Sequence, residues 1–123
     1  NSIRWDLRGS WLGAASARVH TITGFHGYMY IGWPYVGEYE TQAKKGFSKG
    51  VALAWMDEMY HEDHWYNAYK NLCPMALAFG DTSNTAVNRL NERYNSHWAD
   101  VPGTWMATSY YPGCNPDGGY PLP

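Results

Sequence analysis

The sequence predicts an α/β domain with a mostly parallel sheet and flanking helices. Residues 75–79 form a short, continuous apolar run that ends at Gly80, as is typical of a strand buried on both faces in a parallel sheet. Residues 19–25 are rich in β-branched side chains and predict a second strand. Two amphipathic segments alternate with these strands, and this alternation favours a parallel sheet covered by helices.

Two helices are expected from the spacing of apolar residues. The first covers residues 47–65, where Val51, Trp55 and Met59 recur at i, i+4 and i+8 with Ala52 and Met56 beside them. The second covers residues 84–95, where the apolar residues at helical spacing are Val87, Leu90 and Tyr94. The residues able to cap its start are Asp81, Thr82 and Ser83.

Two further segments complete the chain. Residues 28–39 are aromatic and interrupted by Gly and Pro, which predicts a long ordered loop, and residues 104–111 are a candidate third strand. The 123 residues suit a single domain, which we expect over residues 1–111. Residues 112–123 are rich in Pro and Gly and predict an irregular tail lying along the surface.

Composition and charge exclude two classes of partner. The net charge of −2 argues against a general nucleic-acid binder, because binding phosphates needs a basic face. No apolar run approaches the roughly 18 residues of a membrane span.

The chain has two cysteines, Cys73 and Cys114. In a chain rich in Trp and Tyr with few charges, the pair suits an extracellular or secreted protein with one disulfide that pins the tail. Such a bridge closes a loop of about 40 residues and contributes roughly 3–4 kcal/mol. The alternative is two unrelated buried thiols.

His26 lies at the expected carboxyl end of the first strand and is followed by Gly27, so its imidazole could project into a cleft as an acid or base. The alternative is a histidine hydrogen-bonded within an aromatic loop. A dyad with Cys73 is not expected. Cys73 precedes its strand, and a parallel sheet would place it at the end opposite to His26.

A stripe on the first predicted helix has the composition of a metal site. Asp57, His61 and His64 lie at i, i+4 and i+7, and their donor atoms suit a transition metal. No fourth ligand is evident. A solvated polar face is the alternative, and we expect no bound metal or cofactor.

The aromatic segment suggests a binding surface. We expect His26 and the nearby rings to bind a ligand, either a sugar or a partner chain, because Trp and Tyr are enriched at interfaces. The rings concerned are Tyr28, Tyr30, Trp33 and Tyr35, with Tyr39 beside them. The alternative is that most of these rings form the core.

Three segments, residues 18–27, 54–56 and 74–81, resemble the carboxyl-terminal half of a family of uncharacterised secreted bacterial domains, which is similar in fold to the caspase–gingipain group. The resemblance covers about residues 5–95 and transfers no catalytic residue. It implies that the family's own His and Cys lie upstream of Asn1. It also implies that the sheet is incomplete, so that identical subunits or a second chain of the same precursor must cover its edge.

These observations together predict a secreted structural or ligand-binding subunit with a caspase-like fold, in which this chain alone performs no catalysis. One alternative is a subunit of a cysteine peptidase-like enzyme whose nucleophile lies on another chain. The other is an aromatic-rich module that binds carbohydrate.

Overall fold

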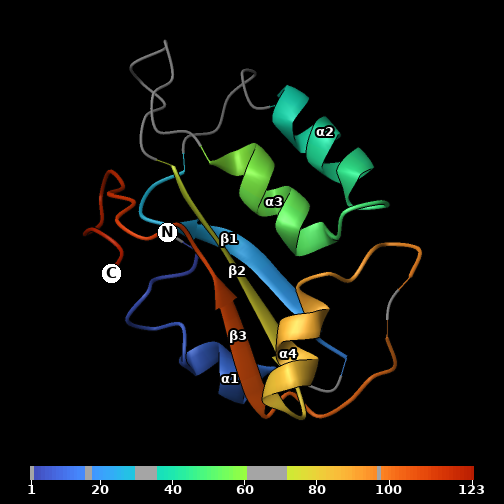
Figure 1. Ribbon diagram of the computed structural model, residues 1–123. Coiled ribbons are helices and arrows are strands. Elements are labelled where there is room, and N and C mark those ends of the chain that lie inside the picture. Colours follow the sequence, from blue (N-terminus) through green and yellow to red (C-terminus); the bar gives the residue numbers. More distant parts are fainter. Residues whose placement is uncertain (1, 16–17, 30–35, 61–71, 97) are drawn as a thin grey trace.

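A computed structural model describes residues 2–15, 18–29, 36–60, 72–96 and 98–123. Its elements, in chain order, are α1 (Ser10–Ala14), β1 (Thr21–His26), α2 (Val36–Lys45), α3 (Val51–Met59), β2 (Cys73–Gly80), α4 (Ser83–Arg89) and β3 (Trp105–Ser109). Figure 1 shows a small sheet with α2, α3 and α4 on one side and α1 on the other. All three strands lie where the sequence predicts them.

The sheet is antiparallel, so the predicted parallel sheet of caspase-like topology is wrong. The strand order is β1-β2-β3, and β2 runs opposite to both neighbours. Thr21 lies opposite Ala78 at one end of the β1–β2 pair, and His26 lies opposite Cys73 at the other. The apolar run in β2 arises because β2 is the central strand of a sheet covered on both faces. It therefore indicates burial and carries no information about strand direction.

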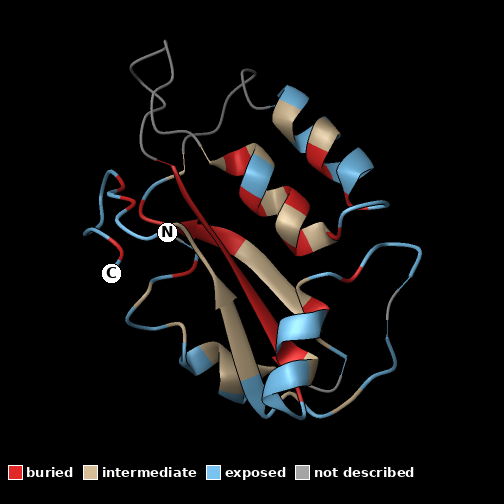
Figure 2. Cartoon of the chain, viewed as in Figure 1, coloured by how far each residue is buried: buried red, intermediate tan, exposed pale blue. Residues whose placement is uncertain are grey.

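The two faces of β2 carry side chains of different size. Every residue of β2 is buried, as Figure 2 shows. On one face Met75, Leu77 and Phe79 pack into the main core with Ile3 and the two cysteines. On the other face Ala76 packs against α3. Small side chains on that face let the helix approach the sheet closely, while the large ones fill the space on the opposite side.

α2 begins within the segment of residues 28–39 that was predicted to be an aromatic loop and continues to Lys45. Glu38 lies in its first turn and Lys44 in its last, which complements the helix dipole, and Glu40 forms an ion pair with Lys44 at 2.6 Å. α3 is shorter than the predicted helix of residues 47–65, since it follows Gly50 and ends at Met59. α4 likewise ends at Arg89, before the predicted end at residue 95.

The tail has no helix or strand and most of its residues are exposed, but Cys114, Pro116 and Leu122 are buried. Cys114 forms the predicted disulfide with Cys73, across a sequence separation of 41 residues. Beyond it, the Leu122 N–H donates to the Cys114 carbonyl at 2.9 Å, and the Leu122 side chain is buried in the main core. The disulfide therefore anchors a segment that also contributes apolar burial of its own.

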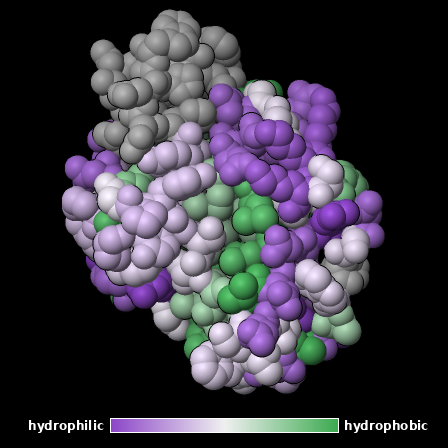
Figure 3. All heavy atoms as spheres, viewed as in Figure 1, coloured by the Kyte–Doolittle hydropathy of each residue, from purple (hydrophilic) through white to green (hydrophobic). Residues whose placement is uncertain are grey.

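The sheet is covered by elements of the same chain. On the molecular surface seen in Figure 3, hydrophobic residues form a band down the middle of the face, between hydrophilic regions. Among the residues that the structure describes, no helix combines the length and apolarity needed to cross a bilayer. β1 and β3 are the two edge strands of this sheet, and the partner predicted to cover an edge stays a prediction.

Candidate functional site

A pocket of about 320 Å³ opens between α4 and the segment that follows it. One side is lined by Asp81, which precedes α4, and by Thr85 and Asn88 on α4. The other side is formed by Trp98, Ala99 and Val101, which belong to the segment of residues 98–101, here called the pocket loop. This volume is at the lower end of the range for small-molecule sites.

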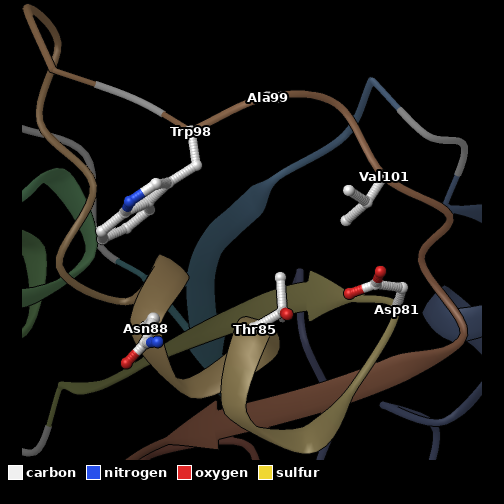
Figure 4. Close-up of a pocket in the computed structure, with 6 residues that line it drawn as sticks. All are labelled: Asp81, Thr85, Asn88, Trp98, Ala99 and Val101. Carbon is white, nitrogen blue, oxygen red and sulfur yellow. The ribbon is translucent and has the colours of Figure 1, made fainter.

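The lining combines one aromatic face with several polar groups (Figure 4). Trp98 and Asn88 lie at one end of the pocket and Asp81 at the other, while Thr85 points into the space between them. The Trp98 side chain is about half exposed, at 48%, so its indole ring is accessible to a ligand. An open indole near a carboxylate, a hydroxyl and an amide can bind a molecule that has both an apolar face and hydroxyl groups.

The turn from β2 into α4 places the polar side of the pocket. A Cβ atom on Gly80 would lie 2.5 Å from the Ala86 nitrogen, so the close approach of strand and helix requires glycine there. Thr82 caps the helix, because its Oγ1 accepts a hydrogen bond from the Thr85 N–H at 3.1 Å. Thr85 and Asn88 are three residues apart and therefore share one face of α4.

The pocket loop is held by three hydrogen bonds from consecutive residues. The Trp98 N–H donates to Glu92 Oε1 at 2.9 Å. The Ala99 carbonyl accepts from Arg89 Nη2 at 2.7 Å. The Asp100 carboxylate lies 2.9 Å from His20 Nε2. Each residue of the loop from Trp98 to Asp100 thus contacts a different member of one polar cluster.

That cluster is formed by His20, Arg89, Glu92 and Asp100, and all of its side chains except that of Asp100 are largely buried. The Arg89 side chain is only 1% exposed, and its Nη1 also donates to the Phe79 carbonyl on β2 at 2.9 Å. Glu92 lies 2.8 Å from His20 Nδ1 and 3.8 Å from Arg89 Nε. Since an unpaired charge is costly in such surroundings, the cluster fixes the loop relative to β1, β2 and α4.

The residues of this cluster were not predicted from the sequence. The predicted apolar face of the second helix was Val87, Leu90 and Tyr94, but Val87 and Tyr94 are about half exposed. Arg89, with Ala86, is buried in their place. The available signal was the pair Arg89 and Glu92 at i and i+3, which the helical pattern assigns to one face.

His26 ends β1 as predicted, but it does not project into an open cleft. Its side chain is buried, with the residue 1% exposed. Nδ1 accepts from the Trp5 N–H at 3.3 Å, and Nε2 donates to the Tyr120 carbonyl at 2.8 Å. His26 borders a second, smaller cavity of about 290 Å³, where the other lining residues are Arg4, Gly118, Gly119 and Tyr120. Its two hydrogen bonds tie the start of the chain to the tail.

The distance argument against a His26–Cys73 dyad is wrong, because the antiparallel register places these residues opposite each other. A different observation excludes the thiol as a nucleophile in this structure, namely its disulfide with Cys114. In addition, Cys73 is the first residue of β2 and does not precede the strand.

The other predicted site residues either lie away from the pocket beside α4 or fall outside the residues that the structure describes. Tyr28 is 56% exposed and binds the tail through its N–H, which donates to the Asp117 carbonyl at 2.8 Å. Asp57 forms an ion pair with Lys49, and α3 ends at Met59. The residues that fall outside the described part are Tyr30, Trp33, Tyr35, His61 and His64. Among the described residues, no three His, Cys, Asp or Glu side chains form a metal-binding group.

Comparisons of the chain with protein-family models, with curated proteins and with solved structures found no match. The pocket between α4 and the pocket loop is therefore characterised by its own geometry and chemistry.

Proposed function

We propose that this chain is an extracellular, disulfide-stabilised domain that binds a carbohydrate in the pocket beside α4. The observation that carries the proposal is the half-exposed indole of Trp98, which lines the same pocket as the polar side chains of Asp81, Thr85 and Asn88. A pyranose ring has an apolar C–H face that packs on an indole and hydroxyl groups at its edge that bind polar side chains.

The charge of the lining narrows the class of sugar. Asp81 is the charged residue among those that line the pocket, so acidic sugars are repelled and neutral or amino sugars are favoured. The volume of about 320 Å³ suits a mono- or disaccharide unit, either free or at the end of a longer chain.

The Cys73–Cys114 disulfide supports the extracellular location, because such bridges form and persist in oxidising compartments. The peptidase-like alternative rested on a parallel sheet. Because the sheet is antiparallel, that alternative is not pursued.

Glycan-array screening followed by calorimetric titration of the bound sugars tests the proposal. We expect Trp98→Ala to weaken binding by about tenfold or more, since it removes the stacking surface. Trp105→Ala is the matched control, because Trp105 is similarly exposed on β3 and does not line the pocket. Absence of any sugar binding, or equal affinity of wild type and Trp98→Ala, would refute the proposal.

A further inference from the structure

We infer that His20 is a positioning residue for the pocket, and that the protonation state of its ring controls the pocket loop. The structural part of this inference stands on the contacts of His20 alone, and its effect on sugar binding rests on the proposed function. His20 precedes β1 and lies 80 residues before Asp100 in the sequence.

Both ring nitrogens of His20 face carboxylate oxygens. Nδ1 lies 2.8 Å and 3.0 Å from the two oxygens of Glu92, and Nε2 lies 2.9 Å from Asp100 Oδ1. An ionised carboxylate only accepts hydrogen bonds, so the ring must donate from both nitrogens. Only the imidazolium form has two N–H groups, whereas a neutral ring directs one nitrogen lone pair at a carboxylate.

The charges around the ring support the same assignment. The ionisable groups of the cluster that face His20 are the carboxylates of Glu92 and Asp100, and Arg89 lies behind Glu92 at 3.8 Å. With an imidazolium the cluster holds two positive and two negative charges. With a neutral ring it holds an excess negative charge beside side chains that are largely buried, which is unfavourable.

Deprotonation should release Asp100 before Glu92. The Asp100 side chain is 57% exposed and can be solvated by water, whereas that of Glu92 is 8% exposed and needs its protein partners. The remaining ring proton would then stay on Nδ1 and bind Glu92. The pocket loop would lose the contact of Asp100 with His20 and keep the bonds of Trp98 and Ala99. The Trp98 N–H would still report the change, because its acceptor, Glu92 Oε1, also faces the His20 ring at 3.0 Å.

The direction of the pH effect follows from this geometry. The contact of Asp100 with the ring needs the imidazolium, so the three-bond form of the loop is lost when the ring loses a proton as the pH rises. Binding at the pocket should therefore be stronger when the His20 ring is protonated and several-fold weaker once the ring is neutral.

NMR of the intact, disulfide-bonded protein without ligand tests the structural part. The ring nitrogens of His20 and the backbone amide of Trp98 are followed from pH 5 to pH 8.5. We expect the Trp98 amide to shift with the same midpoint as the His20 ring, and both ring nitrogens to carry protons below that midpoint. A Trp98 signal that does not change while His20 titrates would overturn the inference, as would a neutral ring throughout the range.

Two variants sharpen the test. His20→Gln should leave the Trp98 amide insensitive to pH, near its high-pH position. If that variant does not fold, Asp100→Asn at the exposed end of the cluster should move the midpoint of the Trp98 shift to lower pH, because it removes one carboxylate that favours the imidazolium. An unchanged midpoint in Asp100→Asn would contradict the mechanism.

Titration of the sugar found by the array, at pH 5.5 and pH 8, separates the two proposals. Coupled shifts of His20 and Trp98 without any sugar binding would support the positioning role and refute carbohydrate binding. Equal affinity at both values, with a Trp98 signal independent of pH, would leave carbohydrate binding intact and refute the role of His20.

Discussion

Arg89 should be among the side chains most important for stability, and replacing it with Met tests this. Its guanidinium donates to the carbonyls of Phe79 and Ala99 at 2.9 Å and 2.7 Å, and its side chain is 1% exposed. Met retains much of the volume but provides no donor. Arg89→Met therefore leaves two carbonyls and the Glu92 carboxylate without the guanidinium beside them.

The expected magnitude follows from these contacts. A hydrogen bond from a charged donor contributes about 1.5–3 kcal/mol, and breaking a buried ion pair by removing one partner costs about 3–5 kcal/mol. Both estimates describe the loss of the same guanidinium group, so they are not added. We expect Arg89→Met to lower the free energy of unfolding by about 3–5 kcal/mol. The total free energy of unfolding of a native protein is about 5–15 kcal/mol, so the variant should be only marginally stable.

Urea unfolding of the oxidised protein, followed by tryptophan fluorescence and circular dichroism, measures this loss. Arg93→Met is the matched control, because Arg93 is exposed and its replacement should change stability by less than about 0.5 kcal/mol. Arg89→Lys keeps the charge but cannot reach both carbonyls in the same way. Its loss of unfolding free energy should therefore lie between those of Arg93→Met and Arg89→Met. A loss below about 1 kcal/mol in Arg89→Met would refute the structural role of the cluster.

Three further predictions concern contacts that stabilise the fold. Replacing Cys73 and Cys114 together by Ala should lower the free energy of unfolding by about 4 kcal/mol in urea titrations, from the loop-entropy estimate for a 41-residue separation. Gly80→Ala should lower the melting temperature, because the added Cβ would lie 2.5 Å from the backbone of α4. The hydrogen bond from the Tyr120 hydroxyl lowers the pKa of Asp6, so this contact stabilises the fold above the ordinary carboxyl range and is lost as pH falls through the lowered pKa. Tyr120→Phe should therefore raise the pKa of Asp6 in a carboxyl NMR titration, and an unchanged pKa would contradict this reading.

The strands were predictable from the sequence, whereas their direction was not. β-branched residues before His26 and the apolar run before Gly80 are local signals, and β1 and β2 form at those positions. Strand direction depends on how the connections pack, and an apolar run is the same for a central antiparallel strand as for a parallel one. The three-stranded sheet buries β2 because the tail and the first residues of the chain cover one face of it.

The helices show the limit of periodicity. The pattern of Val87, Leu90 and Tyr94 indicates a helix, but the helix ends at Arg89, and an arginine occupies the buried side. Burial of Arg89 is favourable only because two carbonyls and Glu92 happen to face it. The two carbonyls come from β2 and the pocket loop, so the local sequence around Arg89 does not specify them, and Glu92 is the one of these partners that lies nearby in the sequence.

The pocket was not predictable for the same reason. Trp98 is one of seven tryptophans in the chain, and nothing in its neighbours distinguishes it as a binding residue. Its position depends on a hydrogen bond to Glu92 and on the contact of Asp100 with His20, which lies 80 residues before Asp100 in the sequence. The aromatic segment of residues 28–39 was the more conspicuous signal in the sequence, but only part of it is described, and α2 begins within it.

His20 and His26 show how strongly partners determine chemistry. They lie at the two ends of β1, and the residue type is the same. His26 accepts from the Trp5 N–H and donates to the Tyr120 carbonyl, so its partners require a neutral ring with the proton on Nε2. His20 faces carboxylates with both nitrogens, so its partners require the charged ring. The same residue type therefore has two roles in this fold: His26 links the start of the chain to the tail, and His20 positions the pocket loop.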